Sequence, residues 1–275
     1  MARLIGYIGS QAERLTCVLT RHRDAIARDG QPSDGWGIGF YQGDEVLLRR
    51  RPRDPRIGLS FLDLTREIQT DVLIGHIRSA TIGEARQENT HPFRFRSWIF
   101  AHQGTVGRFP AVRSRLLESV PDFLRRNVRG ETDSEHFFHL FLAFLHDAGK
   151  LEDPDVGVTA AMDALRTSLG LLDRLVAEVG GAKSTMNAVA TNGRILLALR
   201  RGPALHYMRL EGLRDCEVCR IPAERSDRSP KPVDHDALRY AMVASDIGNR
   251  PGWTELPDGS VLGLRRDLQA VVTAL

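Results

Sequence analysis

Hydrophobic and polar positions alternate in short runs along the chain, and turn residues separate these runs. Such runs predict β-strands, because side chains of a strand point to opposite faces in turn. A first group comprises Arg3–Gly9, Trp36–Tyr41, Glu45–Arg50, Val72–Arg78 and Trp98–Ala101. A second group comprises Thr185–Thr191, Arg194–Arg200, Leu205–Arg209, Ala241–Ser245, Ser260–Leu264 and Gln269–Val272. Asn192-Gly193 between two of these runs indicates a hairpin and favours antiparallel pairing.

Apolar residues at helical spacing fill the middle of the chain. The expected helices are Glu13–Ala27, Phe61–Ile68, Ala111–Ser119, Ser134–Ala148 and Val158–Val179. Asp133-Ser134 supplies cap candidates for the fourth helix, and Gly180-Gly181 ends the fifth. The polar, proline-bearing segment Glu224–Asp236 is expected to be a loop. Strands, two long helices and further strands predict an α+β fold with helices packed on sheet faces.

Composition places the chain among ordinary globular proteins. Its 275 residues are 42% hydrophobic and 27% charged, which excludes disordered, collagen-like and coiled-coil classes. A net charge of +3 is no footprint of nucleic-acid binding. The densest basic run, Arg49–Arg56, is interpreted as a solvated strand end and loop, with an anion patch as the minor alternative. Nucleic acid is therefore an unlikely partner, although an interaction protein with an arginine-rich face remains a third hypothesis.

We expect a cytoplasmic protein without a membrane segment. MARLIGYIGS lacks an export leader, and the most apolar segment, Phe137–Leu145, is about half the ~20 residues that span a bilayer. Three cysteines, Cys17, Cys216 and Cys219, are too few for a disulfide scaffold. Cys216 and Cys219 form a single CxxC; His206 and His235 are distant in sequence, so an incidental reduced pair is favoured over a metal site. No cofactor is expected either, because phosphate-cradle motifs are missing.

Five stretches carry polar residues beside glycines at expected strand and helix ends. They are DGWG at 34–37, HIRSAT at 76–81, NTHPF at 89–93, H-x-G-T at 102–105 and GETDSE at 130–135. Together they supply a fixed cation, Arg78, a carboxylate, Asp133, and backbone donors. These groups suit an α-amino acid, whose carboxylate pairs with arginine and whose ammonium pairs with aspartate. The alternative for Arg78 and Asp133 is a simple ion pair or a helix cap.

In this order, followed by MNAVATNGRILLALR, the stretches resemble class II glutamine amidotransferases, which are N-terminal-nucleophile proteins. The nearest branch is the stand-alone one that includes the ergothioneine-pathway amidohydrolase and glutathione-degradation enzymes. The resemblance extends to about residue 247 and implies one domain over residues 1–275. It also implies a four-layer αββα sandwich of two stacked, mainly antiparallel sheets.

The resemblance assigns roles to particular residues. Arg78 would hold the α-carboxylate of glutamine, and Asp133 its α-ammonium. Four further residues would support this pocket: Ser79 and Thr81 would line it, His91 would brace it and Trp36 would pack beside it. The partner would be a small amino acid or γ-glutamyl compound.

Two positions depart from the family pattern. The family opens Met-Cys, and the cysteine thiolate attacks the γ-amide; this chain has Ala2, whose methyl group cannot be a nucleophile. Gln103 stands where the family has an asparagine that forms the oxyanion hole with the N–H of Gly104. Loss of one such donor costs ~10²–10³ in rate.

Two hypotheses follow from these departures. The favoured one is a catalytically deficient protein that binds an amino acid or γ-glutamyl ligand and acts by binding or regulation, with a protein partner allowed. The alternative is an active amidotransferase or γ-glutamyl amide hydrolase, represented here by a variant in which alanine replaces the nucleophile. Cys17 is expected to be a buried structural thiol rather than a substitute nucleophile.

Overall fold

The computed structural model of the chain describes residues 3–26, 35–52, 61–77, 84–221 and 233–275. The strands are β1 (Arg3–Gly9), β2 (Gly35–Gln42), β3 (Glu45–Pro52), β4 (Val72–Ile77), β5 (Phe93–Phe95), β6 (Trp98–Thr105), β7 (Thr185–Thr191), β8 (Ile195–Arg200), β9 (Leu205–Glu211), β10 (Arg239–Ser245), β11 (Thr254–Glu255), β12 (Ser260–Arg265) and β13 (Ala270–Ala274). The α-helices are α1 (Leu15–Arg21), α2 (Arg23–Ile26), α3 (Phe61–Thr65), α4 (Phe109–Glu118), α5 (Asp122–Arg125), α6 (Asp133–Asp147), α7 (Val158–Glu178) and α8 (Val233–Asp236). Two 3₁₀ turns span Ala12–Arg14 and Gln87–Asn89.

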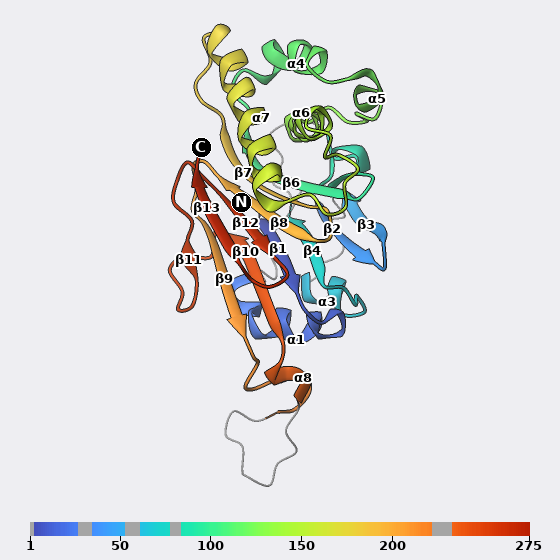
Figure 1. Cartoon of the computed structure of the whole chain (residues 1–275), viewed down its shortest axis with the longest axis vertical. Coiled ribbons are helices and arrows are strands. Elements are labelled where there is room, and N and C mark those ends of the chain that lie inside the picture. Colours follow the sequence, from blue (N-terminus) through green and yellow to red (C-terminus); the bar gives the residue numbers. More distant parts are fainter. Residues whose placement is uncertain (1–2, 27–34, 53–60, 78–83, 222–232) are drawn as a thin grey trace.

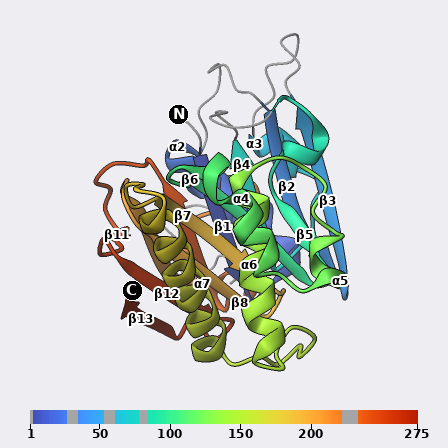
Figure 2. The same ribbon diagram turned by 90° about the horizontal axis from the view of Figure 1, so that it is seen from above.

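Two antiparallel sheets lie face to face between two helical layers. One sheet has the strand order β11-β9-β10-β1-β4-β2-β3, and the other has β13-β12-β8-β7-β6-β5. Helices α4 to α7 cover the second sheet, and α1 and α3 lie beyond the first (Figures 1 and 2). The expected α+β fold with four αββα layers is therefore confirmed.

Each interface between layers holds one hydrophobic cluster. Trp98, Phe100 and the apolar face of α6 form the cluster under the long helices. Leu4 and Ile99 belong to the cluster between the two sheets. The third cluster joins α1 to the outer face of the first sheet. Alternation along each strand explains this division, because neighbouring residues must enter different layers.

Several predicted elements match the structure closely. Arg3–Gly9 and Thr185–Thr191 have the predicted bounds. The predicted hairpin connects β7 to β8, which pair antiparallel. Its turn depends on Asn192, whose Oδ1 accepts hydrogen bonds from the N–H groups of Arg194 and Ile195, and on Gly193, whose φ of +86° favours glycine.

Other predictions differ from the structure. The expected helix Glu13–Ala27 is divided into a 3₁₀ turn, α1 and α2, and the break falls at His22. There the His22 ring hydrogen-bonds the Tyr240 hydroxyl at 2.9 Å, a tertiary contact that helical periodicity does not reveal. The expected loop Glu224–Asp236 is wrong at its end, where α8 forms; the part up to residue 232 lies outside the described residues. Strands β5 and β11 and helix α5 are too short for a periodic signal.

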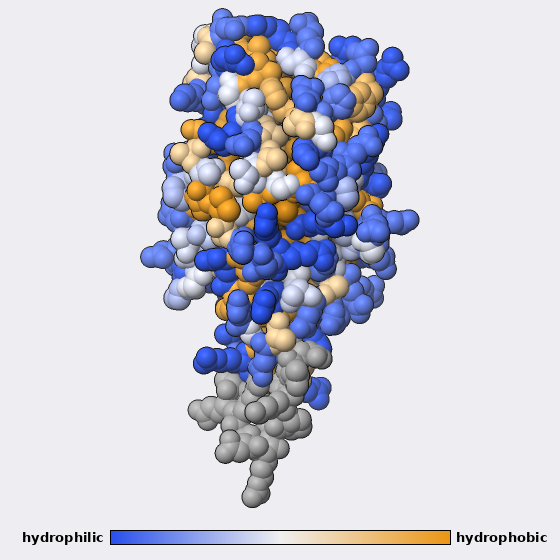
Figure 3. All heavy atoms as spheres, viewed as in Figure 1, coloured by the Kyte–Doolittle hydropathy of each residue, from blue (hydrophilic) through white to orange (hydrophobic). Residues whose placement is uncertain are grey.

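The surface of the protein is largely hydrophilic in the view of Figure 3. Hydrophilic side chains cover much of the face in Figure 3, with hydrophobic ones between them. Within the described ranges, no helix is both long and apolar enough to cross a membrane. In the basic run, the Arg49 guanidinium lies 5.6 Å from the Phe40 ring centroid, and Arg50 donates to the Thr90 carbonyl; Arg53 and Arg56 lie outside the described residues.

We predict that Phe141→Ala lowers the free energy of unfolding by about 3–5 kcal/mol, because it leaves a cavity under α6. Phe141 is fully buried, and its ring lies 5.2 Å from that of Trp98. Phe123 on α5 is 40% exposed and provides the matched control, for which we expect a change below about 1 kcal/mol. Urea denaturation measures both; equal losses would contradict the assigned core.

Acid is expected to destabilise the protein partly through His139. Burial lowers the pKa of His139 to about 4, against about 6.5 in the unfolded chain. Below pH 6.5 the unfolded state binds this proton more readily, so stability falls as pH drops from 6.5 towards 4. His139→Gln should reduce the loss between pH 7 and pH 5 by about 1–2 kcal/mol in urea titrations. His146→Gln, at an exposed site on the same helix, should leave the loss unchanged.

Candidate functional site

The structure describes five of the nine predicted site positions. Trp36, His91, Gln103, Gly104 and Asp133 are described, and Ala2, Arg78, Ser79 and Thr81 lie outside the described residues. The strands that lead to this second group are nevertheless neighbours. Arg3, the first residue of β1, pairs with Ile77, the last residue of β4. Ala2 and Arg78 are therefore each one peptide bond away from the same strand pair.

Asp133 joins the end of β6 to the start of α6. Its Oδ2 accepts a hydrogen bond from the Val106 N–H at 2.8 Å, and its Oδ1 accepts one from the Ser134 N–H at 2.9 Å. The residue is 3% exposed. Ser134 Oγ also lies 3.4 Å from Oδ1. A carboxylate offers about four acceptor positions, so capacity remains for a further donor. Asp133 thus has a structural role that is compatible with binding an ammonium group.

His102 reinforces the same junction. Its Nδ1 lies 2.8 Å from Ser134 Oγ, and its Nε2 lies 3.3 Å from the Thr185 carbonyl oxygen. Burial lowers the pKa of His102, against the opposing effect of the Asp133 charge, so the ring is neutral near pH 7. Since a carbonyl only accepts, Nε2 carries the proton and Nδ1 accepts from the Ser134 hydroxyl.

Side chains satisfy backbone N–H groups at and just before the start of α6. The Thr132 hydroxyl accepts from the Glu135 N–H, and the Glu135 carboxylate accepts from the N–H groups of Arg129 and Gly130 at 3.0 and 2.6 Å. The cap is therefore Thr132; the predicted cap residues Asp133 and Ser134 are the first residues inside the helix. Burial raises the pKa of Glu135, and the two backbone donors oppose that rise.

Gly104 occupies a position that no other residue fits. Its φ is +156°, and a Cβ there would lie 2.2 Å from the Thr185 carbonyl oxygen and 2.7 Å from His102 Nε2. The strand therefore passes β7 so closely that a side chain would displace backbone. This close approach fixes the peptide that follows Gln103.

Gln103 faces the layer between the two sheets. Trp98 and Phe100 belong to the cluster under the helices, whereas Ile99 and Ala101 belong to the cluster between the sheets. Alternation along β6 places Gln103 with the second pair. That layer also contains Leu4, two residues after Ala2. The structure thus directs Gln103 towards the sheet that contains the start of β1.

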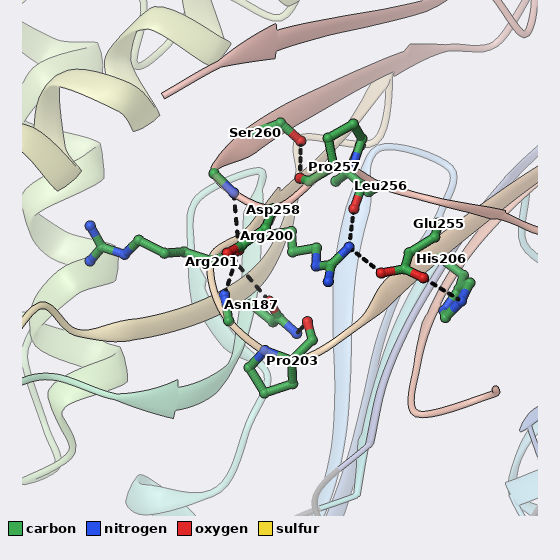
Figure 4. Close-up of polar contacts among 12 residues, drawn as sticks. Asn187, Arg200, Arg201, Pro203, His206, Glu255, Leu256, Pro257, Asp258 and Ser260 are labelled. Atoms are coloured by element: carbon green, nitrogen blue, oxygen red, sulfur yellow. Dashed lines mark hydrogen bonds and ion pairs between the residues drawn. The ribbon is translucent and has the colours of Figure 1, made fainter. Parts of the chain in front are cut away.

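Asn187 belongs to the stretch MNAVATNGRILLALR that resembles the family, but the sequence predicts no role for it. It pairs with Gln103 across β6 and β7 and is fully buried. Its Nδ2 donates to the Pro203 carbonyl at 2.9 Å, and its Oδ1 accepts from the Arg201 N–H at 3.3 Å (Figure 4). A buried asparagine in an apolar strand is the sequence signal for such a bridge. The bridge holds the strand beside Gln103 against the β8–β9 connection.

Neighbouring groups extend this support away from the site. The Arg201 guanidinium pairs with both Asp173 oxygens, at 2.8 and 2.6 Å, and so links β8 to α7. Arg200 pairs with Glu255, whose other oxygen lies 3.9 Å from His206 Nε2 (Figure 4). His206 therefore lies beside the Arg200–Glu255 ion pair and does not join the described cysteines.

His91 packs against both β2 and β4. A Cβ on Gly37 would lie 1.9 Å from the His91 carbonyl oxygen, so glycine lets this segment approach β2. The His91 ring centroid is 4.2 Å from that of His76, two residues before Arg78. The peptide His91-Pro92 is cis. His91 is thus placed beside the strand that leads to Arg78, which suits the predicted bracing role.

A hydrogen bond joins the NTHPF stretch to the GETDSE stretch. Asn89 Oδ1 accepts from the Glu131 N–H at 2.9 Å. A Cβ on Gly130 would lie 2.5 Å from the same Oδ1. The fold therefore brings together four of the five motifs through hydrogen bonds or close backbone packing, and HIRSAT reaches them through its described residues His76 and Ile77.

Trp36 lies apart from this junction. It pairs with Ile77 in the sheet, but its side chain packs against the cluster under α1. Trp36 and Gln103 thus face different layers. Packing of Trp36 beside the pocket stays a prediction.

Arg3 is a site-supporting residue without a predicted role. Its guanidinium is buried and donates to the carbonyls of Ala25 at 2.9 Å and Asp246 at 3.0 Å. The Leu4 N–H donates to Ser245 Oγ. An arginine at the start of an apolar strand is the signal that could have revealed this anchor. These bonds fix β1 directly after position 2.

No described cysteine replaces the missing nucleophile. Cys17 lies on α1 beneath the outer face of the first sheet, with its Sγ 3.7 Å from Cys219 Sγ. Burial raises the pKa of Cys17 to about 12, and contacts with Cys216 and Cys219 add to the rise. Without a metal ion on its sulfur, the Cys17 thiol is therefore neutral near pH 7 and a poor nucleophile.

The chain is similar in sequence and fold to proteins of known name. The probable glutamine amidotransferase DUG3 of Saccharomyces cerevisiae is 25% identical over 97% of this chain and 82% of the yeast protein. The gamma-glutamyl-hercynylcysteine sulfoxide hydrolase of Mycolicibacterium smegmatis is 24% identical over 100% of both chains. A class II glutamine aminotransferase domain protein from Silicibacter pomeroyi has a similar fold, with a TM-score of 0.62, 22% identity and coverage of 99% of this chain and 98% of that one.

The family comparison covers nearly the whole chain. Residues 1–268 match the family described as class II glutamine amidotransferases. This span includes every motif of the site and all strands except β13. The chain belongs to the class II glutamine amidotransferase family.

Proposed function

We propose that this chain binds glutamine or a γ-glutamyl compound and acts by binding rather than by hydrolysis. Arg78 holds the ligand's α-carboxylate and Asp133 its α-ammonium, with Ser79, Thr81 and His91 around them. Residues 1–275 act as one amidotransferase-like domain, and a partner protein would bind the chain when its ligand pocket is occupied. Ala2 and Gln103 stand where the reaction needs a thiol and a shorter amide.

The observation that carries the proposal is the hydrogen-bonded junction around Asp133. Val106 and Ser134 orient its carboxylate, and His102 ties Ser134 to β7. Gly104 keeps the backbone that only glycine permits. A chain that had lost its ligand would gain nothing from a buried carboxylate with unused acceptor capacity, because burying a charge is costly.

The relatives support the ligand class. One is named a probable glutamine amidotransferase and another a hydrolase of a γ-glutamyl compound. Glutamine and γ-glutamyl compounds share a free α-carboxylate and α-ammonium. A pocket built from one arginine and one aspartate recognises this shared end and leaves the γ-substituent variable.

The chemical argument for deficiency rests on two positions. A methyl group at position 2 has no lone pair to attack an amide. Gln103 has one methylene more than the family's asparagine, which moves its amide by about an ångström relative to the Gly104 N–H, and oxyanion-hole donors act only at hydrogen-bond distance. One change alone would suffice to slow the reaction, and the chain carries both.

The alternative is an active amidotransferase or γ-glutamyl amide hydrolase whose native residue 2 is cysteine. The intact junction around Asp133 and Gly104 favours this alternative as much as it favours binding. The native codon at position 2 decides between a natural alanine and a variant.

The ligand-binding role of Arg78 can be tested by calorimetry with glutamine. Arg78→Met removes a charge-assisted pair with the α-carboxylate, so the affinity should fall by about 10–100-fold. Arg86→Met is the matched control: this exposed arginine pairs with Glu84, and its loss should leave the affinity unchanged. Equal affinities for glutamine in both variants would contradict the assigned pocket.

Restoring the chemistry tests the two departures separately. Ala2→Cys should gain slow glutaminase activity, and Ala2→Cys combined with Gln103→Asn should be faster by about 10²–10³. Ammonia release from glutamine measures both rates. Gln103→Asn alone is the control and should remain inactive because it has no nucleophile.

Two outcomes would count against the account of deficiency. If Ala2→Cys alone were as fast as the double variant, Gln103 would be a competent oxyanion donor. If the double variant were inactive although it bound glutamine normally, a further lesion in the site would be required.

A further inference from the structure

Three cysteines and a histidine that are far apart in sequence meet on the outer face of the first sheet. They are Cys17 on α1, Cys216 and Cys219 after β9, and His235 on α8. One ligand atom from each residue lies within 4.8 Å of every other. Cys17, Cys216 and His235 are buried, and Cys219 is exposed. The sequence analysis considered only the Cys216–Cys219 pair, and the fold adds the other two donors.

Cys216 and Cys219 lie in one tight turn, which brings their sulfurs close together. Cys216 and Ile221 exchange two backbone hydrogen bonds, each 2.9 Å long. Arg220 adopts a φ of +55°, which closes the turn. The Cys219 N–H lies 3.4 Å from Cys216 Sγ and donates to it. This bond fixes the two cysteines relative to each other within the turn.

The other two donors are held against this turn by separate contacts. Leu15, Val18 and Leu19 anchor α1 in the hydrophobic cluster that also contains Cys17 and Cys216. The Leu213 N–H donates to the His235 carbonyl at 2.8 Å, which fixes α8 beside the start of the turn. The meeting of these residues therefore follows from the packing of three elements.

The spacing matches the coordination sphere of one zinc ion. Zinc binds thiolates at about 2.3 Å and imidazole at about 2.0–2.1 Å with tetrahedral angles, which places neighbouring sulfurs about 3.8 Å apart. Cys17 Sγ and Cys219 Sγ are 3.7 Å apart. The limit of 4.8 Å for all pairs leaves at most about 1 Å of contraction. An iron–sulfur cluster places several atoms between its cysteines and would need a wider arrangement.

A disulfide explains fewer of the observations. Its sulfurs would be about 2.0 Å apart, and it would use two of the three thiols. The third thiol and the imidazole would then have no reason to converge. Three sulfurs and one nitrogen fill all four positions of tetrahedral zinc, a donor set typical of structural sites.

The geometry points to a structural zinc site formed by Cys17, Cys216, Cys219 and His235. The ion ties α1 to the segment between β9 and β10. Ion pairs Arg21–Asp215 and Arg23–Glu217 cross the same junction. Because α1 follows β1, the site also stabilises the helical layer behind the strand that begins at Arg3. The exposed Cys219 offers the route by which zinc enters.

Metal analysis of the full chain, purified without a metal-affinity step, tests the site. We expect about one zinc per chain, and Cys219→Ser should retain less than about a fifth of it, since structural affinity depends on the complete ligand set. Glu217→Gln changes an exposed residue of the same turn and should keep the metal. Cobalt added to the metal-free protein should give the intense visible absorption of a tetrahedral thiolate site.

Circular dichroism separates metal loss from misfolding. Cys219→Ser should keep the secondary structure and lose zinc, with a lower melting temperature that added zinc does not restore. Absence of bound zinc in the wild-type chain after incubation with excess zinc under reducing conditions would overturn the site. A Cys17–Cys219 disulfide in the intact mass of freshly isolated protein would overturn it as well.

Discussion

The Asp133 carboxylate is the interaction on which the site depends. It accepts hydrogen bonds from the N–H of Val106, just beyond β6, and from the N–H of Ser134 in the first turn of α6. The same turn is tied to β7 through His102 and to the 89–91 segment through Glu131. Burying a carboxylate costs desolvation free energy, and its two backbone hydrogen bonds offset that cost only while the surrounding elements keep their positions. The hydrogen bonds that hold the Asp133 carboxylate in place therefore also hold the strands and the helix around it.

Under the proposed function, this constraint would let the family fold persist without the family chemistry. The groups around Asp133 and Gly104 contribute to the packing of β6, β7 and α6 in addition to the proposed ligand contact. Ala2 and Gln103 bear on the reaction instead. A protein that needed only to bind a ligand could lose the thiol and the short amide without disturbing the layers. The proposed binding role is consistent with this division of labour.

Much of the fold could be predicted from the sequence, and the particular failures have physical causes. Strands such as Thr185–Thr191 were predictable because turn residues bound them and their burial alternates or is complete. The break at His22 was not, since it depends on a hydroxyl contributed by Tyr240. At the site, the motifs indicated Gln103, Gly104 and Asp133, but the layer that each faces required the strand register. The approach of Cys17 to Cys219 spans 202 residues and has no local signal.

The central claim is that ligand binding has been separated from turnover, and one NMR experiment on the unaltered chain addresses both parts. Glutamine at millimolar concentration is observed by saturation-transfer difference while free glutamate is followed over hours. The account predicts saturation transfer to glutamine, competition by a γ-glutamyl peptide, and no glutamate above the rate in buffer. Glutamate release at a rate proportional to protein concentration, or no saturation transfer at millimolar glutamine, would contradict it.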